Sequence, residues 1–309
     1  MTCSKAASKK PLLLVDGREL AFKDRQVRES EEIQRLKQEF DWVYPLPNED
    51  GVRLPKNARS ASISFPSDSW DDDALNEEGM GVWADIRLEA INSIMVSRKL
   101  STIWEVGAGN GSVCIGLSKL GHETIAVEPL YGGAKYIADQ GLVSFGSTLE
   151  ELKLPNSSIE AIGVFDVLEH IEEPIPMLQE FSRVLGRKGL LIITVPAHQF
   201  LFSEYDSSIG HYRRYSVSEL ESSLTAAGFE LVKARFLFSF LVPLAWLLRV
   251  LPEKLGVSSS ATSRKSSRTQ FRIAQLFSPV FRALVALEKI LRPPFGLSII
   301  ALARPRDNS

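Results

Sequence analysis

From residue 102 onward, short runs of β-branched and aliphatic residues alternate with stretches whose apolar residues recur every three or four positions. This alternation is the pattern of a sheet whose strands are joined by helices. The expected strands are 102–106, 124–128, 142–145, 161–165 and 190–195, and the expected helices between them are 111–120, 133–139 and 175–185. Because the crossovers are short, we expect parallel strands with ligands bound at their carboxyl ends.

The flanking segments complete this arrangement. A helix is expected at 80–100, and another begins after Ser216, where Glu219 three residues later forms a capping-box pattern. A sixth strand (229–235), an apolar segment (236–251), a Ser/Arg/Lys-rich linker (258–269), an amphipathic helix (271–291) and a last strand (297–303) follow. We therefore expect a Rossmann-like, doubly wound α/β fold with a mostly parallel seven-stranded sheet. It forms a domain of residues 79–305 with a helical insertion at 236–293, an N-terminal extension at 1–78 with one hairpin and a helix near 31–40, and a tail at 306–309.

Composition excludes several classes of protein. A chain of 309 residues with 44% apolar and 24% charged residues can bury a core and is not disordered. The net charge of −2 argues against a globally basic nucleic-acid binder, so no nucleic-acid partner is predicted. Cys3 and Cys114 form no CxxC pair, so no metal site is predicted and a reducing compartment is favoured. The polar first residues resemble no secretory signal, and a cytoplasmic location is expected.

The strongest motif is Glu-Val-Gly-Ala-Gly-Asn-Gly at 105–111, where the first strand meets the first helix. Glycines at alternate positions permit a tight turn and a close approach of the backbone to a ligand, and the helix N-terminus supplies N–H donors. The dinucleotide fingerprint requires a glycine where this chain has Ser112, which disfavours NAD. Glu128 ends the second strand, where a carboxylate can accept the hydroxyls of an adenosine ribose.

These residues resemble the glycine motif of the class I S-adenosylmethionine-dependent methyltransferases. The resemblance implies that S-adenosylmethionine is the cofactor and that Glu128 holds its ribose. The loop would lie beside the methionine part, with Glu105, Gly107, Ala108, Gly109 and Gly111 as its binding residues. The family often has an Asp near the adenine after the third strand. Here the segment is Gly-Ser-Thr-Leu at 146–149, so a contact from Thr148 or Leu149 would come from a hydroxyl or the backbone, or be absent.

The fourth strand ends in Asp-Val-Leu-Glu-His at 166–170, which is similar to the family's DVLEH segment. The resemblance implies that Asp166 and Leu168 face the cofactor. His170 has two interpretations: it is a helix-terminus or packing histidine, or it lies near the transferred methyl group. His122 and His198 are expected to be structural.

Residues 196–215, PAHQFLFSEYDSSIGHYRRY, follow the fifth strand and should overhang its carboxyl end. The string resembles a subgroup of these methyltransferases often associated with modification of cell-envelope polysaccharides or lipids. The subgroup also has a tryptophan helix, matched by Trp83 with Arg87, and a terminal Pro-Phe-Gly-Leu-Ser strand, matched at 294–298. The resemblance therefore covers about residues 77–305.

Methyl transfer requires an aligned nucleophile and, for a hydroxyl or amine, removal of its proton. His211 is the candidate base because imidazole titrates near neutral pH, and Asp206 could orient it. Arg213 and Arg214 suit a phosphate or carboxylate on the substrate. The predicted substrate-binding residues are these two arginines together with Trp83, Tyr212 and Tyr215. The alternative is a structural loop whose aromatic and guanidinium groups pack over the cofactor.

The insertion is basic as well as apolar. Residues 235–292 contain ten basic and two acidic residues, and in the helix at 271–291 one apolar face is expected from Phe271, Ala274, Phe277, Phe281, Leu284 and Leu291. Its helices form a cap on the substrate cleft, or they also lie on an anionic membrane surface at the inner face of a membrane. The apolar stretch 236–251 is shorter than the roughly 20 residues that span a bilayer.

The predicted function is S-adenosylmethionine-dependent methylation of a small or lipid-linked acceptor, at an oxygen, nitrogen or carbon atom. The alternatives are a nicotinamide-dependent oxidoreductase, which Ser112 disfavours, and a non-catalytic, membrane-associated protein that binds S-adenosylmethionine. The identity of the acceptor and the oligomeric state stay open.

Overall fold

The computed structural model describes residues 14–15, 18–19, 30–40, 42, 45–55, 81–255 and 278–306. The predicted linker at 258–269, residues 271–277 and the last three residues lie outside this part of the chain. The predicted hairpin is represented by two short antiparallel strands, β1 (Leu14–Val15) and β2 (Arg18–Glu19).

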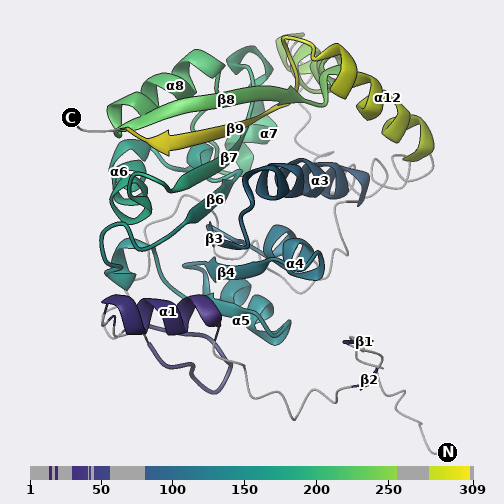
Figure 1. The fold of residues 1–309 in the computed structure, drawn as a ribbon. Helices are drawn as coiled ribbons and strands as arrows, with labels where there is room; N and C mark the ends of the chain where they lie inside the picture. The colour runs from purple at the N-terminus through teal and green to yellow at the C-terminus, as the bar shows by residue number, and fades with distance from the viewer. Residues whose placement is uncertain are drawn as a thin grey trace, which may run out of the picture.

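A seven-stranded sheet forms the centre of the molecule, with the strand order β5-β4-β3-β6-β7-β9-β8 (Figure 1). Its strands are β3 (Thr102–Val106), β4 (Glu123–Val127), β5 (Val143–Phe145), β6 (Ala161–Phe165), β7 (Leu190–Pro196), β8 (Phe229–Leu237) and β9 (Ser298–Pro305). The first five are parallel, and β9 runs antiparallel between β7 and β8. The predicted fold class is confirmed, and each predicted strand lies within two residues of its observed bounds.

Helices cover both faces of the sheet because its side chains alternate between two cores. In β3, Trp104 and Val106 pack into one core and Ile103 into the other. The first core is closed by α1 (Glu31–Phe40), α6 (Pro174–Leu185) and α8 (Val217–Ala226). The other face carries α3 (Gly81–Arg98), α4 (Ser112–Lys119) and α5 (Tyr131–Asp139). The predicted capping box opens α8, where Ser216 Oγ accepts from the Glu219 amide.

The described part of the N-terminal extension packs onto the sheet. Ile33 and Leu36 of α1 are fully buried. The Trp42 indole donates to the Leu152 carbonyl at 3.0 Å, and the Trp42 ring contacts Trp104 and Phe145. Burial of each large apolar side chain away from water stabilises the folded chain by roughly 1.5–3 kcal/mol. The extension is therefore more than an irregular leader, which the mixed composition of residues 11–75 did not reveal.

The insertion between β8 and β9 is helical, as predicted. It comprises η5 (Ser239–Leu241), α9 (Val242–Ala245), the π-helical η6 (Trp246–Val250), α10 (Leu251–Lys254) and the returning helix α12 (Ser278–Leu291). Figure 1 shows α12 beside α3, at the edge of the sheet where β8 ends.

The predicted apolar face of the returning helix can be followed only from Phe281 onward, because residues 271–277 lie outside the described part of the chain. Phe281 and Val285 of α12 pack into the core beside α3, but Leu284 is 36% exposed and Leu291 is 67% exposed. The inward face is fixed by Glu288, whose carboxylate accepts from the amides of Phe238 and Ser239 at 2.8 and 2.7 Å. A polar contact thus selects which of two apolar faces is buried, and the other stays at the surface.

Candidate active site

The glycine loop leaves β3 in a tight left-handed turn. Gly107, Gly109 and Gly111 have φ values of 74°, 59° and 73°, which residues with a Cβ rarely adopt. Space is also limited, because a Cβ on Gly107 would lie 2.6 Å from Val167 and one on Gly111 would lie 2.5 Å from Ile137. The sequence motif therefore forms the predicted strand–turn–helix, with α4 beginning directly after the loop.

Glu128 follows β4 and fastens this loop from the neighbouring strand. Its Oε2 accepts from the Gly109 amide at 2.7 Å and its Oε1 from the Leu130 amide at 2.8 Å. The side chain is buried, and burial raises its pKa. Each carboxylate oxygen keeps a further lone pair that could accept a ribose hydroxyl.

Glu105 at the end of β3 and Arg87 of α3 each carry a buried polar atom without a hydrogen-bond partner among the described residues. Glu105 is 3% exposed, and its Oε2 has no hydrogen-bond partner among the described residues. Burial raises the pKa of Glu105 to about 8, against the opposing charge of Arg87. Arg87 forms an ion pair with Asp166 but leaves its Nε without a partner in the described structure. Such atoms cost about 1–3 kcal/mol each when unsatisfied, so they mark a place where a polar ligand fits.

Asp166 occupies the carboxyl end of β6 with a φ of 55°, an uncommon value for a residue other than glycine. Its Oδ1 accepts from the Thr194 hydroxyl at 3.1 Å. Thr148 is partly exposed, and its amide donates to Glu151. By contrast, the side chains of Leu149 and Leu168 belong to the core, so only their backbones could contact a cofactor.

Asp206 organises the loop that contains His211. His211 Nδ1 lies 3.1 Å from Asp206 Oδ1, and Arg214 donates to the same oxygen from Nε at 2.9 Å and from Nη2 at 2.6 Å. The other carboxylate oxygen accepts from the Ser203 amide and hydroxyl, which caps α7 (Glu204–Ser208). Although burial opposes ionisation, the contacts with His211 and Arg214 hold the pKa of Asp206 at about 2. The predicted pairing of His211 with Asp206 is therefore present.

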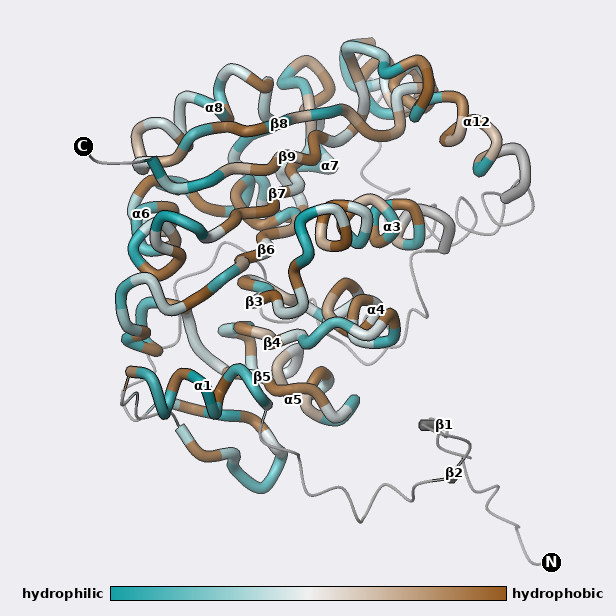
Figure 2. The backbone as a smooth tube through the Cα atoms, viewed as in Figure 1, coloured by the Kyte–Doolittle hydropathy of each residue, from teal (hydrophilic) through white to brown (hydrophobic). Residues whose placement is uncertain are grey.

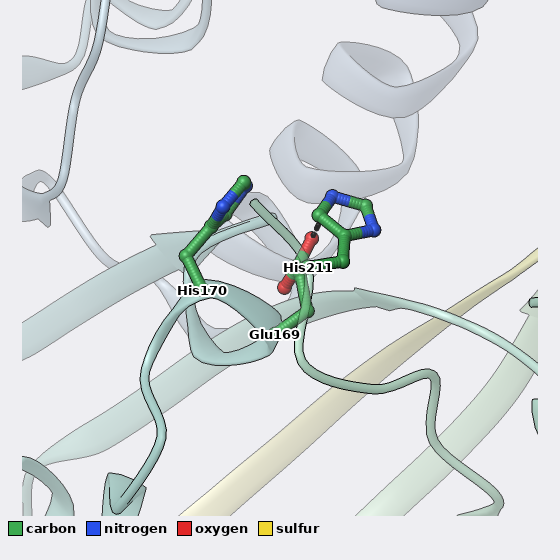
Figure 3. Close-up of side chains that lie close together, drawn as sticks. All are labelled: Glu169, His170 and His211. Carbon is green, nitrogen blue, oxygen red and sulfur yellow. Dashed lines mark ion pairs between the residues drawn. The ribbon is translucent and has the colours of Figure 1, made fainter. Parts of the chain in front are cut away.

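His170 stands beside His211 at the end of η3 (Leu168–His170), with ring centroids 4.6 Å apart at an angle of 81°. His170 Nδ1 lies 3.2 Å from the Gly210 carbonyl. Burial, together with the neighbouring His211, lowers the pKa of His170 to about 4. Glu169 lies under both rings, as Figure 3 shows, and is completely buried.

The predicted substrate residues separate into two groups. Arg214 and Tyr215 are buried, with Arg214 held by Asp206 and the Tyr215 hydroxyl donating to the Leu168 carbonyl at 3.3 Å. These two fit the structural alternative, because their polar groups are used inside the protein. Tyr212 is 45% exposed, and Arg213 donates to the Glu172 carbonyl at 2.5 Å. Trp83 lies in α3, but its side chain is outside the described part of the structure.

Comparison with known proteins identifies the family. A model described as a methyltransferase domain matches residues 76–234, just over half of the chain. The chain belongs to the S-adenosylmethionine-dependent methyltransferases of class I, and the predicted family and cofactor are confirmed.

Relatives in two mycobacteria share part of the sequence. A probable S-adenosylmethionine-dependent methyltransferase of Mycobacterium tuberculosis is 34% identical over 85 residues, covering 27% of this chain and 31% of the relative. A probable S-adenosylmethionine-dependent methyltransferase of Mycolicibacterium smegmatis is 31% identical over 84 residues, which cover 26% of this chain and 33% of the relative. The chain thus matches about a third of the length of these curated relatives.

Similar solved structures include a putative sarcosine dimethylglycine methyltransferase from Galdieria sulphuraria (14% identity, 72% of this chain and 86% of that chain, TM-score 0.46). Another is a possible histamine N-methyltransferase from Thermotoga maritima (24% identity, 50% of this chain and 86% of that chain, TM-score 0.37).

Proposed function

We propose that this chain transfers a methyl group from S-adenosylmethionine to an oxygen, nitrogen or carbon atom of a small or lipid-linked acceptor. The observation that carries the proposal is that two buried atoms, Glu105 Oε2 just before the glycine loop and Arg87 Nε, have no hydrogen-bond partner in the described structure. An unused acceptor and an unused donor suit the ammonium and the carboxylate group of an amino acid, respectively. The methionine part of the cofactor carries both groups.

The remaining cofactor contacts follow from the positions of the strands. Glu128 would receive the ribose hydroxyls, and Thr148 lies in the segment assigned to the adenine. Because Gly107, Gly109 and Gly111 carry no side chains, the glycine loop permits a close approach of the cofactor to the backbone. In this proposal residues 79–305 form the methyltransferase domain.

In the reaction, the acceptor atom attacks the methyl carbon in line with the bond to sulfur. That bond breaks with its electron pair left on sulfur, which yields S-adenosylhomocysteine, and the acceptor must lose a proton. Because the ionised Asp206 can only accept, neutral His211 donates from Nδ1 and carries its lone pair on Nε2. We assign His211 as the proton acceptor and Asp206 as the residue that orients it.

The insertion supports an apolar acceptor because it adjoins the His211 loop. Arg249 lies over the Tyr205 ring at 4.6 Å, and the Glu204 amide donates to Glu253 at 3.1 Å. A groove of about 390 Å³ lies between α3, β8 and α12, and its lining includes apolar residues such as Ile86 and Val285. The charged residues that line it are Lys233, Arg235, Glu288, Lys289 and Arg292, four basic and one acidic.

The exposed apolar side chains of the insertion suit contact with a membrane surface. They are Leu244, Trp246, Leu247, Leu248, Leu255, Leu284, Leu287, Ile290 and Leu291, and Figure 2 shows the apolar residues along α12. Two of the basic residues of the insertion are engaged within the protein, since Arg282 pairs with Asp85 and Glu89, and Lys289 pairs with Glu89. Among the described residues no helix has the length and apolarity needed to cross a bilayer. We therefore propose peripheral contact at the inner, cytoplasmic face of a membrane, led by apolar burial.

Incubation of the purified chain with S-adenosylmethionine carrying a radiolabelled methyl group tests the function. Soluble and lipid extracts of cells serve as separate acceptor pools. We expect label in the lipid fraction, with less in the soluble fraction. Binding of the cofactor without transfer to either pool would instead favour the non-catalytic alternative.

A further inference from the structure

We propose that Glu169, His170 and His211 form a binding site for one divalent transition-metal ion. One ligand atom from each of the three side chains lies within 4.8 Å of the others. Figure 3 shows the carboxylate of Glu169 beneath the two imidazole rings. An ion with bonds of 2.0–2.2 Å places its ligands about 3.4 Å apart. A shift of the side chains by roughly 1 Å would therefore close the cluster around the ion.

The hydrogen bonds of the two histidines select the tautomer that binds a metal. A carbonyl oxygen only accepts, so His170 Nδ1 donates to Gly210, and the ionised Asp206 likewise accepts from His211 Nδ1. In the neutral ring, Nε2 then carries the lone pair. Metal-ligating histidines almost always hold their second nitrogen in this way, on a carbonyl or a carboxylate. The supporting contacts are thus in place.

Glu169 is otherwise difficult to explain. Its carboxyl group is fully buried, and among the described residues neither oxygen has a hydrogen-bond partner of acceptable geometry, although its own amide lies near. His211 Nε2 is 3.9 Å from Oε1, too far for a hydrogen bond. An unsatisfied buried carboxylate is costly, and coordination of a cation would remove that cost.

The surrounding charges favour a cation. Arg87 is paired with Asp166 and Arg214 with Asp206, so both guanidinium groups near Glu169 are engaged by other carboxylates. Burial raises the pKa of Glu169 well above its usual range, and a cation bound beside it would supply the positive charge that allows this carboxyl to lose its proton. Two nitrogen ligands and one oxygen ligand select zinc, cobalt or iron(II) over magnesium and calcium, which prefer oxygen.

Three protein ligands leave coordination positions open, as in catalytic metal sites. This consequence rests on the proposed function: an acceptor hydroxyl bound there would have a lowered pKa, and its proton would leave to water. With the ion bound, His211 serves as a ligand and the ion takes over the task of preparing the acceptor to lose its proton, so His211 accepts the proton only in the ion-free site. The site was not expected from the sequence because His211 is far along the chain from Glu169 and His170, without a recognisable ligand spacing.

The test uses the full chain after treatment with a chelator. Equilibrium dialysis against Zn²⁺ measures stoichiometry, and visible absorption of added Co²⁺ reports nitrogen ligation. We expect one ion per chain, with affinity reduced at least tenfold in Glu169→Gln and in His170→Ala. The matched control is His122→Ala, because His122 lies before β4, bonded to Asn92, and should bind metal as the wild type does.

Binding that is absent in the wild type, or unchanged in both cluster variants, would overturn the proposal. Glu169→Gln preserves the side-chain shape, so it remains informative if His170→Ala does not fold. Calorimetric titration of the cofactor-free protein with S-adenosylmethionine separates the proposed metal site from the proposed function. Retained cofactor binding without metal binding rejects the metal site alone, whereas loss of cofactor binding in the wild type rejects the proposed function.

Discussion

The Gly109 amide donates to Glu128 Oε2 at 2.7 Å and thereby joins the glycine loop of β3 to the end of β4. Hydrogen bonds to charged groups contribute roughly 1.5–3 kcal/mol. Glu128→Ala should therefore weaken S-adenosylmethionine binding by about 10- to 100-fold, since it removes both this bond and the proposed ribose contact. Calorimetry measures the change. An affinity equal to that of the wild type would show that Glu128 does not hold the cofactor.

The buried pair of Asp206 and Arg214 predicts a large effect on folding. Arg214→Met leaves the buried Asp206 charge with its contacts to His211 and Ser203 but without a guanidinium partner, so we expect a loss of about 3–5 kcal/mol in the free energy of unfolding. Urea denaturation measures it. Arg213→Met is the control and should cost less than about 1 kcal/mol. Equal losses in the two variants would contradict the assignment of Arg214 as the structural member of the pair.

His211→Ala should abolish most turnover while the affinity for S-adenosylmethionine stays close to that of the wild type. Proton transfer by a positioned side chain contributes typically about 10²–10⁴-fold. Single-turnover transfer of labelled methyl, measured beside calorimetry on the same protein, separates the two effects. A parallel loss of turnover and cofactor affinity would make His211 a structural residue.

Glu105 predicts how stability depends on pH in the absence of cofactor. Its pKa is about 8 in the folded chain and near 4.5 when unfolded, so folding takes up a proton between these values. The contribution to stability is complete below about pH 4.5 and is lost as the pH rises to about 8, at roughly 1.4 kcal/mol per unit. Glu105→Gln stays neutral and should remove this loss. The free energy of unfolding is measured by urea denaturation across this pH range. If it changed with pH in the same way in the wild type and in the variant, the raised pKa of Glu105 would be refuted.

The exposed face of α12 predicts membrane binding through apolar contact. Replacing both Leu287 and Ile290 with Gln should reduce sedimentation with anionic phospholipid vesicles at least tenfold, because each side chain contributes on the order of 1.5–3 kcal/mol when buried. Val96→Gln on α3 is the control, since this exposed residue lies outside the insertion. Vesicle binding that is unaffected by the double substitution would show that this face of α12 does not bind the membrane.

Local patterns were sufficient to predict the sheet and the glycine loop. Strand periodicity placed β3 and β6 at their observed bounds, and the glycine spacing identified a turn that only residues without a Cβ can form. Ser216 with Glu219 likewise predicted the start of α8, because a capping box is contained within four residues.

Features that depend on distant parts of the chain could not be predicted in this way. Glu169 and His211 meet only once β6 and the loop after β7 lie at the same edge of the sheet. Arg214 was expected to bind substrate because a guanidinium group suits either a ligand or an internal carboxylate. On α12, two apolar faces were available, and Glu288 selected between them through backbone amides of another segment.

Calorimetric titration of the wild-type chain tests the central claim most directly. We predict saturable one-to-one binding of S-adenosylmethionine, competition by S-adenosylhomocysteine and no binding of NAD⁺. Absence of S-adenosylmethionine binding, or binding of NAD⁺ at the same site, would contradict the assignment of the glycine loop, Glu105 and Glu128 as its pocket.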